Sequence, residues 1–258
     1  FPELRPQIYN HEAMPYEGCI LGYFTVWQGP ENNVCDSLNI QKRNEVLIGW
    51  SKDGFHWNRE NKKPFLPVSE DFHAWNAGNV QSTAGSPLIV GDSLYFYVSG
   101  RYNSKPKHDS NFATGLAMLR RDGFVSMRAG RKEGYVEIKT KIPANGNYLF
   151  VNADVKGTLA VEVLDDNGQP MEGFTKKDCI SMKKSDKTKQ MISWEKHPGV
   201  TSLVGKTVRL KFYLNQADIY AFWISAWQTG ESGGYTGGGG PGLSDKGIDT
   251  PIDKLKNN

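Results

Sequence analysis

One carboxylate lies at the start of a strongly apolar segment. Glu17 stands between Tyr16 and Gly18 and directly precedes residues 19–27, which are apolar on both faces of an extended chain. Such a run predicts a strand buried between sheets. A carboxyl group in these surroundings can keep its proton near neutral pH, as a general acid must. We therefore identify Glu17 as the candidate catalytic residue; the alternative is a carboxylate that closes a turn or pairs with an arginine.

Other polar and aromatic residues have the chemistry of saccharide binding. Trp75 can stack on a sugar ring, and the nearby amides offer both donors and acceptors. Arg43 precedes a predicted strand and can reach hydroxyl groups, whereas the alternative is a salt bridge within its loop. For the region around Trp75, the alternative to a binding site is a packed turn. The predicted substrate-binding residues are Tyr16, Trp27, Arg43, Trp75, Asn79, Gln81 and Arg101.

A repeat in residues 1–127 indicates how these groups are positioned. Two Asp-Gly pairs, Asp53-Gly54 and Asp122-Gly123, are about 70 residues apart, and the apolar segments 20–27 and 94–98 repeat at a similar spacing. Asp-Gly favours a tight hairpin because the turn needs positive φ. Antiparallel hairpins at a fixed period are typical of a β-propeller. The region supplies about two blades, and a ring needs four or more, so we expect a preceding segment or a second chain to complete it.

The pattern changes after residue 127. Apolar and polar residues alternate strictly in 136–142, 158–163 and 208–214. This alternation predicts an antiparallel β-sandwich over residues 128–228. Residues 229–258 are rich in glycine and poor in apolar side chains, which predicts a flexible tail. The expected fold class is therefore all-β: a partial β-propeller followed by a sandwich.

Composition excludes several classes of function. The 258 residues carry a net charge of only +3, with dispersed basic residues, so nucleic acid is not an implied partner. No apolar run is long enough to span a membrane. The three cysteines and five histidines show no metal-ligand spacing, so we expect no cofactor. The alternative left open is a structural Ca²⁺ bound by oxygen atoms of the loops. Because the chain starts at Phe1, we expect a removed leader or a longer protein, secreted or periplasmic in a bacterium.

Several stretches carry a resemblance to a known superfamily: residues 16–18, 51–57, 91–97 and 149–153. The chain resembles the C-terminal half of a five-bladed β-propeller glycoside hydrolase, similar to families 32, 43 and 68, with a β-sandwich behind the propeller. The resemblance implies three acids along the propeller axis. Only Glu17 matches one of them, the general acid. Residues 1–16 contain no aspartate, so the two partner aspartates are expected upstream of Phe1.

Two functions follow. The first is a glycoside hydrolase acting on a plant or microbial polysaccharide or oligosaccharide, which needs a second carboxyl group besides Glu17. The alternative is a non-catalytic carbohydrate-binding or interaction protein that keeps part of the fold. An acidic groove around Glu17 favours the enzyme. An uncharged aromatic groove, with Glu17 tied to an arginine, favours the binding protein.

Overall fold

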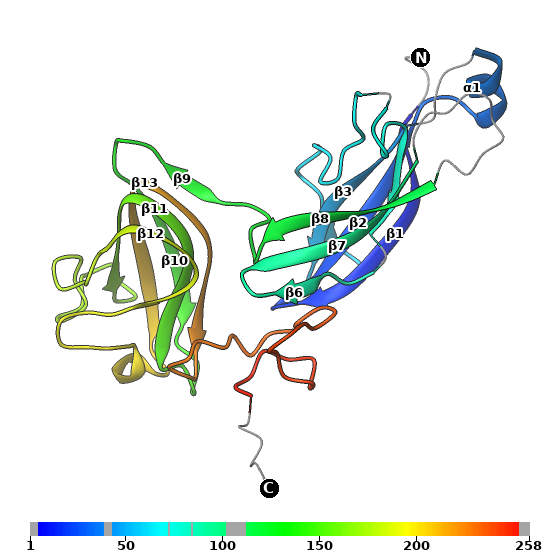
Figure 1. The fold of residues 1–258 in the computed structure, drawn as a ribbon. Coiled ribbons are helices and arrows are strands. Elements are labelled where there is room, and N and C mark those ends of the chain that lie inside the picture. The colour runs from blue at the N-terminus through cyan, green and yellow to red at the C-terminus, as the bar shows by residue number, and fades with distance from the viewer. Residues whose placement is uncertain (1–4, 39–42, 72, 84, 102–111, 253–258) are drawn as a thin grey trace, which may run out of the picture.

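The computed structural model describes residues 5–38, 43–71, 73–83, 85–101 and 112–252. It consists of two separate strand systems and one short helix, α1 (Asn32–Leu38) (Figure 1). The predicted fold class is confirmed. The chain is all-β, with a curled first sheet that is consistent with a partial propeller and a second sheet that is consistent with a sandwich. Within these ranges, no helix has the length and apolar character needed to cross a membrane.

The first sheet contains two antiparallel groups of strands. Its spatial order is β1-β2-β3-β5-β7-β6, with β4 paired to β3 and β8 paired to β7. A single parallel contact, between Asn44 and Asn79, joins the groups. They correspond to the two repeats predicted from the sequence. The strands are β1 (Gln7–Tyr16), β2 (Cys19–Gln28), β3 (Arg43–Ser51), β4 (Trp57–Asn58), β5 (Asn79–Ser82), β6 (Leu88–Val90), β7 (Ser93–Arg101) and β8 (Phe112–Arg120).

The core of the first sheet lies between its two groups. Tyr23 of β2 is 2% exposed and meets Phe96 of β7 edge to face, with ring centroids 5.9 Å apart. Val46 and Val98 join the same buried cluster. On the opposite face of β2, Phe24 is also buried, against other aromatic rings. Strand β2 is therefore covered on both faces, as its continuous apolar run predicts.

The second sheet is built on two long antiparallel strands, β11 and β13. Its spatial order is β10-β13-β11-β12, with β9 also paired to β13. Register shifts near residues 155–158 interrupt the long pair, and Gln216 has a positive φ of 43°. Both halves of the strands contribute to one buried cluster, which closes the core. The strands are β9 (Met127–Ala129), β10 (Gly134–Lys141), β11 (Tyr148–Leu164), β12 (Met182–Ile192) and β13 (Thr207–Ser225), with a 3₁₀ turn at Thr201–Leu203.

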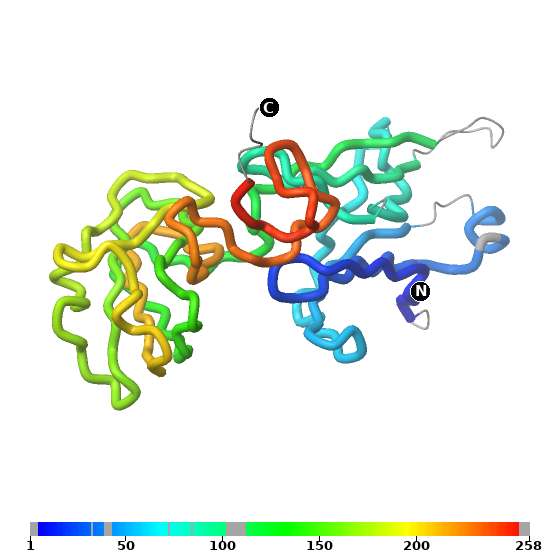
Figure 2. The backbone as a smooth tube through the Cα atoms, turned by 90° about the horizontal axis from the view of Figure 1, so that it is seen from below, coloured from blue at the N-terminus to red at the C-terminus, as the bar shows by residue number. Residues whose placement is uncertain are grey.

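The segment after β13 runs along one end of the first sheet (Figures 1 and 2). Tyr235 and Glu17 exchange backbone hydrogen bonds of 2.8 and 3.2 Å, and the Ile89 amide donates to the carbonyl of Gly239. A Cβ at Gly240 would fall 1.7 Å from the Ile89 carbonyl oxygen, so only glycine permits this approach. The glycine-rich composition did not predict such a placement.

Candidate functional site

A cavity of about 850 Å³ lies between the two strand systems. We call it the interface cavity. Six parts of the chain meet around it: the β1–β2 turn, the β6–β7 turn, the hairpin after β8, strands β12 and β13, and the segment after β13. Ligand sites are common at such junctions. The residues that line it include Tyr16, Glu17, Arg121, Asp122, Trp223, Ser232, Tyr235 and Asp249.

The tight turn between β1 and β2 positions Glu17. Tyr16 pairs with Cys19, which leaves only Glu17 and Gly18 in the connection. Glu17 has a φ of +49°, a conformation that is uncommon for a residue with a side chain. Its backbone is fixed from outside by the paired hydrogen bonds with Tyr235. The carboxylate is thereby held where the strand systems meet, with its side chain 26% exposed.

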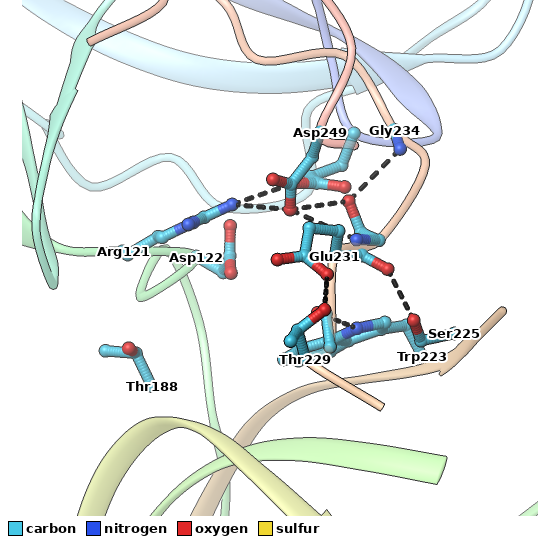
Figure 3. Close-up of polar contacts among 12 residues, drawn as sticks. Arg121, Asp122, Thr188, Trp223, Ser225, Thr229, Glu231, Gly234 and Asp249 are labelled. Carbon is cyan, nitrogen blue, oxygen red and sulfur yellow. Dashed lines mark hydrogen bonds and ion pairs between the residues drawn. The ribbon is translucent and has the colours of Figure 1, made fainter. Parts of the chain in front are cut away.

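Two aspartates and one arginine complete an acidic cluster around Glu17. Figure 3 shows Arg121, Asp122 and Asp249 of this cluster. The Tyr16 hydroxyl donates a hydrogen bond of 2.5 Å to Asp122. The Arg121 guanidinium lies 3.0 Å from an oxygen of Asp249 and 3.8 Å from an oxygen of Glu17. Because three carboxyl groups share one guanidinium, the fully ionised cluster would carry an excess of two negative charges.

Burial and crowding shift the protonation of this cluster. Burial, followed by the charge of Asp122, raises the pKa of Glu17 to about 7, although a hydrogen bond from Ser232 and the charge of Arg121 oppose the shift. Burial also raises the pKa of Asp122, against the hydrogen bond from Tyr16. Glu17 is therefore close to half protonated at neutral pH, so it can either donate or accept a proton.

An aromatic surface lies beside the acids. Trp223 lines the interface cavity and stacks on Phe150, with ring centroids 5.6 Å apart and an interplanar angle of 14°. Its indole nitrogen donates a hydrogen bond of 3.0 Å to the carbonyl of Gly230. These contacts fix the ring against the segment after β13 (Figure 3). Aromatic rings next to carboxyl groups are suited to binding sugar rings and acting on their oxygens.

The structure brings only Tyr16 and Glu17, among the predicted site residues, to the interface cavity. Trp27 and Arg43 lie at the far end of the first sheet, about 30 Å away along β2. Arg43 makes ion pairs of 2.9 Å with Glu45 and Glu70. A salt bridge with a nearby acid was the alternative that the sequence left open, although Arg43 and Glu45 belong to β3 and not to a loop.

The remaining predicted residues lie in the second strand group. The Trp75 ring covers Gly100 and Gly115, where any Cβ would fall 2.3 Å from it, so Trp75 packs against β7 and β8. Asn79 is buried at the contact between β3 and β5. Gln81 and Arg101 line a second, smaller hollow. A substrate-binding role for these residues stays a prediction.

Sequence reasoning missed Asp122 and Asp249. Asp122 belongs to the second Asp-Gly pair, and the repeat identified it only as a turn residue. The first copy, Asp53, is exposed and accepts hydrogen bonds from the amides of Phe55 and His56. The half-buried Asp122 instead bonds to Tyr16, so the same motif serves a different role. Asp249 lies in the glycine-rich segment, where no local pattern indicates a site.

The described residues contain no group of three or more histidine, cysteine, aspartate or glutamate side chains arranged to hold a metal ion.

Comparison with known proteins gives little guidance. No family model and no curated protein matches the chain. One solved structure that resembles it is the crystal structure of a protein described as "a putative glycoside hydrolase from Parabacteroides distasonis". The TM-score is 0.33 and the identity is 14%, over 66% of this chain and 54% of the other. This chain thus spans about half the length of that protein, and likeness at this level leaves function to be argued from the site.

Proposed function

We propose that the protein containing this chain hydrolyses glycosidic bonds in the interface cavity, with a plant or microbial polysaccharide or oligosaccharide as substrate. The observation that carries the proposal is the arrangement of Glu17, Asp122 and Asp249 around Arg121, beside the ring of Trp223. Hydrolysis of a glycoside needs one carboxyl group that donates a proton and a second that attacks or activates water.

Glu17 is the proton donor in this proposal. Its raised pKa leaves a substantial protonated fraction at neutral pH. Asp122 and Asp249 are the two candidates for the second carboxyl group. The resemblance placed the partner aspartates upstream of Phe1, whereas the interface cavity offers two within the chain. Asp249 has the firmer support for an ionised role, since it lies against Arg121.

The first test is hydrolysis by the natural protein containing this chain. Aryl glycosides and plant and microbial polysaccharides are assayed with the wild type, Glu17→Gln and Asp53→Asn. We expect Glu17→Gln to lower kcat by about 10²–10⁴-fold, the usual contribution of a positioned acid. Asp53→Asn alters the exposed copy of the Asp-Gly motif and should leave the rate unchanged. Equal rates for wild type and Glu17→Gln would remove Glu17 from the mechanism.

A second candidate, a non-catalytic carbohydrate-binding protein, is favoured by one observation. Glu17 faces Arg121 at 3.8 Å, and its carboxylate packs so closely on Gly234 that a Cβ there would fall 2.2 Å from it. In this candidate, the role of the Glu17 carboxylate is purely structural: it fixes the segment after β13. Saccharide binding by calorimetry, with no turnover of any substrate by the wild type, would select this candidate.

An exposed apolar face supports the proposal that more of the fold precedes this chain. Tyr97 of β7 lies opposite Leu116 of β8, and the two side chains are 49% and 47% exposed. Met118, on the same face of β8, is 66% exposed. Adjacent exposed apolar side chains on a sheet usually mark a covered surface. We propose that a preceding segment or a second chain packs here, as the incomplete propeller predicts.

A further inference from the structure

The second hollow, of about 600 Å³, lies where β1, β5, β7 and β8 meet. We call it the edge pocket. Its polar residues are Asn10, Glu12, Gln81, Ser82, Ser99, Arg101 and Thr114. Glu12 lies four residues before Tyr16 on β1, so about 13 Å of strand separates it from the interface cavity. The two cavities share no lining residue.

Two charged groups in the edge pocket are held in place but do not neutralise each other. One oxygen of the Glu12 carboxylate accepts hydrogen bonds from the hydroxyl (2.6 Å) and the amide (3.2 Å) of Thr83. The Arg101 guanidinium lies over the ring of Phe112, 4.4 Å from its centroid. Among the described residues, neither Glu12 nor Arg101 forms an ion pair. Each therefore keeps hydrogen-bonding capacity for a ligand.

A hydrogen-bond acceptor that lacks a donor among the described residues also lies in the wall of the edge pocket. The side-chain oxygen of Asn10 is buried and has no hydrogen-bond partner among the described residues. The backbone oxygen of Gln81 accepts from Thr25, while its side-chain amide makes no hydrogen bond within the described part of the chain. Buried acceptors are usually satisfied, so an orphan beside a hollow indicates a group that arrives from outside. That group must donate a hydrogen bond.

The charges restrict the chemistry of the ligand. A phosphate or carboxylate that approaches Arg101 also meets Glu12, and a cation that approaches Glu12 also meets Arg101. A polyhydroxylated, uncharged molecule avoids both conflicts, since each hydroxyl can donate to Glu12 or Asn10 and accept from Arg101 or Gln81. We propose that the edge pocket binds a neutral saccharide, independently of the interface cavity. The proposal does not require the interface cavity to be catalytic.

The test is calorimetric titration of the natural protein with neutral oligosaccharides (cello-, xylo-, manno-, malto- and fructo-oligosaccharides). Oligogalacturonate and inorganic phosphate serve as charged probes. Gln81→Ala and Arg101→Ala each remove donors from the pocket, and neither side chain makes a hydrogen bond in the described structure. We expect each variant to weaken the binding of the best neutral saccharide by about tenfold or more, with an unchanged melting temperature.

A matched control separates the two cavities. Glu17→Gln and Trp223→Ala alter only the interface cavity and should leave this affinity unchanged, whatever they do to hydrolysis. The proposal is overturned if no neutral saccharide binds, if affinity survives both edge-pocket variants, or if the interface-cavity variants abolish it. Tighter binding of oligogalacturonate or phosphate than of any neutral saccharide would overturn the ligand class.

Discussion

Replacing Glu17 by glutamine should change how stability depends on pH. The pKa of Glu17 is about 7 in the folded chain, against an ordinary value of 4.5. Between these values the folded chain binds more protons than the unfolded chain, so the free energy of unfolding falls as the pH rises. Since one pH unit corresponds to about 1.4 kcal/mol, the full loss is at most about 3 kcal/mol. Water at the partly exposed Glu17 side chain reduces this loss of unfolding free energy further.

Glutamine has no charge to gain, so the variant should lack this loss. Relative to the wild type, Glu17→Gln should gain up to about 3 kcal/mol between about pH 5 and pH 8. Guanidinium unfolding followed by tryptophan fluorescence measures the difference at each pH. Glu60→Gln, on an exposed loop, controls for the loss of one charge. The same pH slope in the wild type and in Glu17→Gln would refute the buried, proton-sharing environment.

Two further predictions concern the groups around Glu17. Asp122→Asn removes a nearby negative charge and should lower the pKa of Glu17, which carboxyl ¹³C NMR measures. The control variant Asp53→Asn should leave this pKa unchanged. Equal pKa shifts in the two variants would show that the charge of Asp122 does not act on Glu17. Gly240→Ala places a Cβ 1.7 Å from a carbonyl oxygen of β6 and should cost about 1–3 kcal/mol, with faster proteolysis of residues 229–252. Gly18→Ala meets no atom within 4 Å and serves as the neutral control; equal stability of the two variants would contradict the packing.

Local signals in the sequence were sufficient for the strands. The continuous apolar run at 19–27 predicts a strand covered on both faces, and β2 is such a strand. The strict alternation at 208–214 predicts one buried face, which β13 has. The repeated Asp-Gly pairs predict turns after two equivalent strands. These properties depend on neighbouring residues and on the period of the side chains, so a single sequence contains them.

The composition of the site was not predictable in the same way. Glu17 was identified because its own neighbours are aromatic and apolar. Arg121 and Asp249 reach it only through the tertiary fold, more than 100 residues along the chain. The segment that carries Asp249 makes close backbone contacts at Gly234 and Gly240 and contributes one apolar side chain, Leu243, to the core of the first sheet. Apolar content therefore gave no sign of its placement.

The predicted substrate-binding residues show that closeness along the chain does not by itself place side chains in one site. Trp27 and Glu17 flank the same strand, and the sequence grouped both into one site. A strand of ten residues instead holds its ends about 30 Å apart. Gln81 and Arg101 lie close together, since β5 and β7 are paired near their ends. They line the edge pocket and not the cavity around Glu17.

The most direct test of the central claim compares leaving groups. A proton donor matters greatly when the departing oxygen is basic and little when it is not. The natural protein and Glu17→Gln are assayed on a phenyl glycoside and on the matching 2,4-dinitrophenyl glycoside of a sugar that the wild type hydrolyses. We predict a loss of about 10²-fold or more on the phenyl substrate and a far smaller loss on the dinitrophenyl substrate. Equal losses on both substrates would contradict Glu17 as the proton donor.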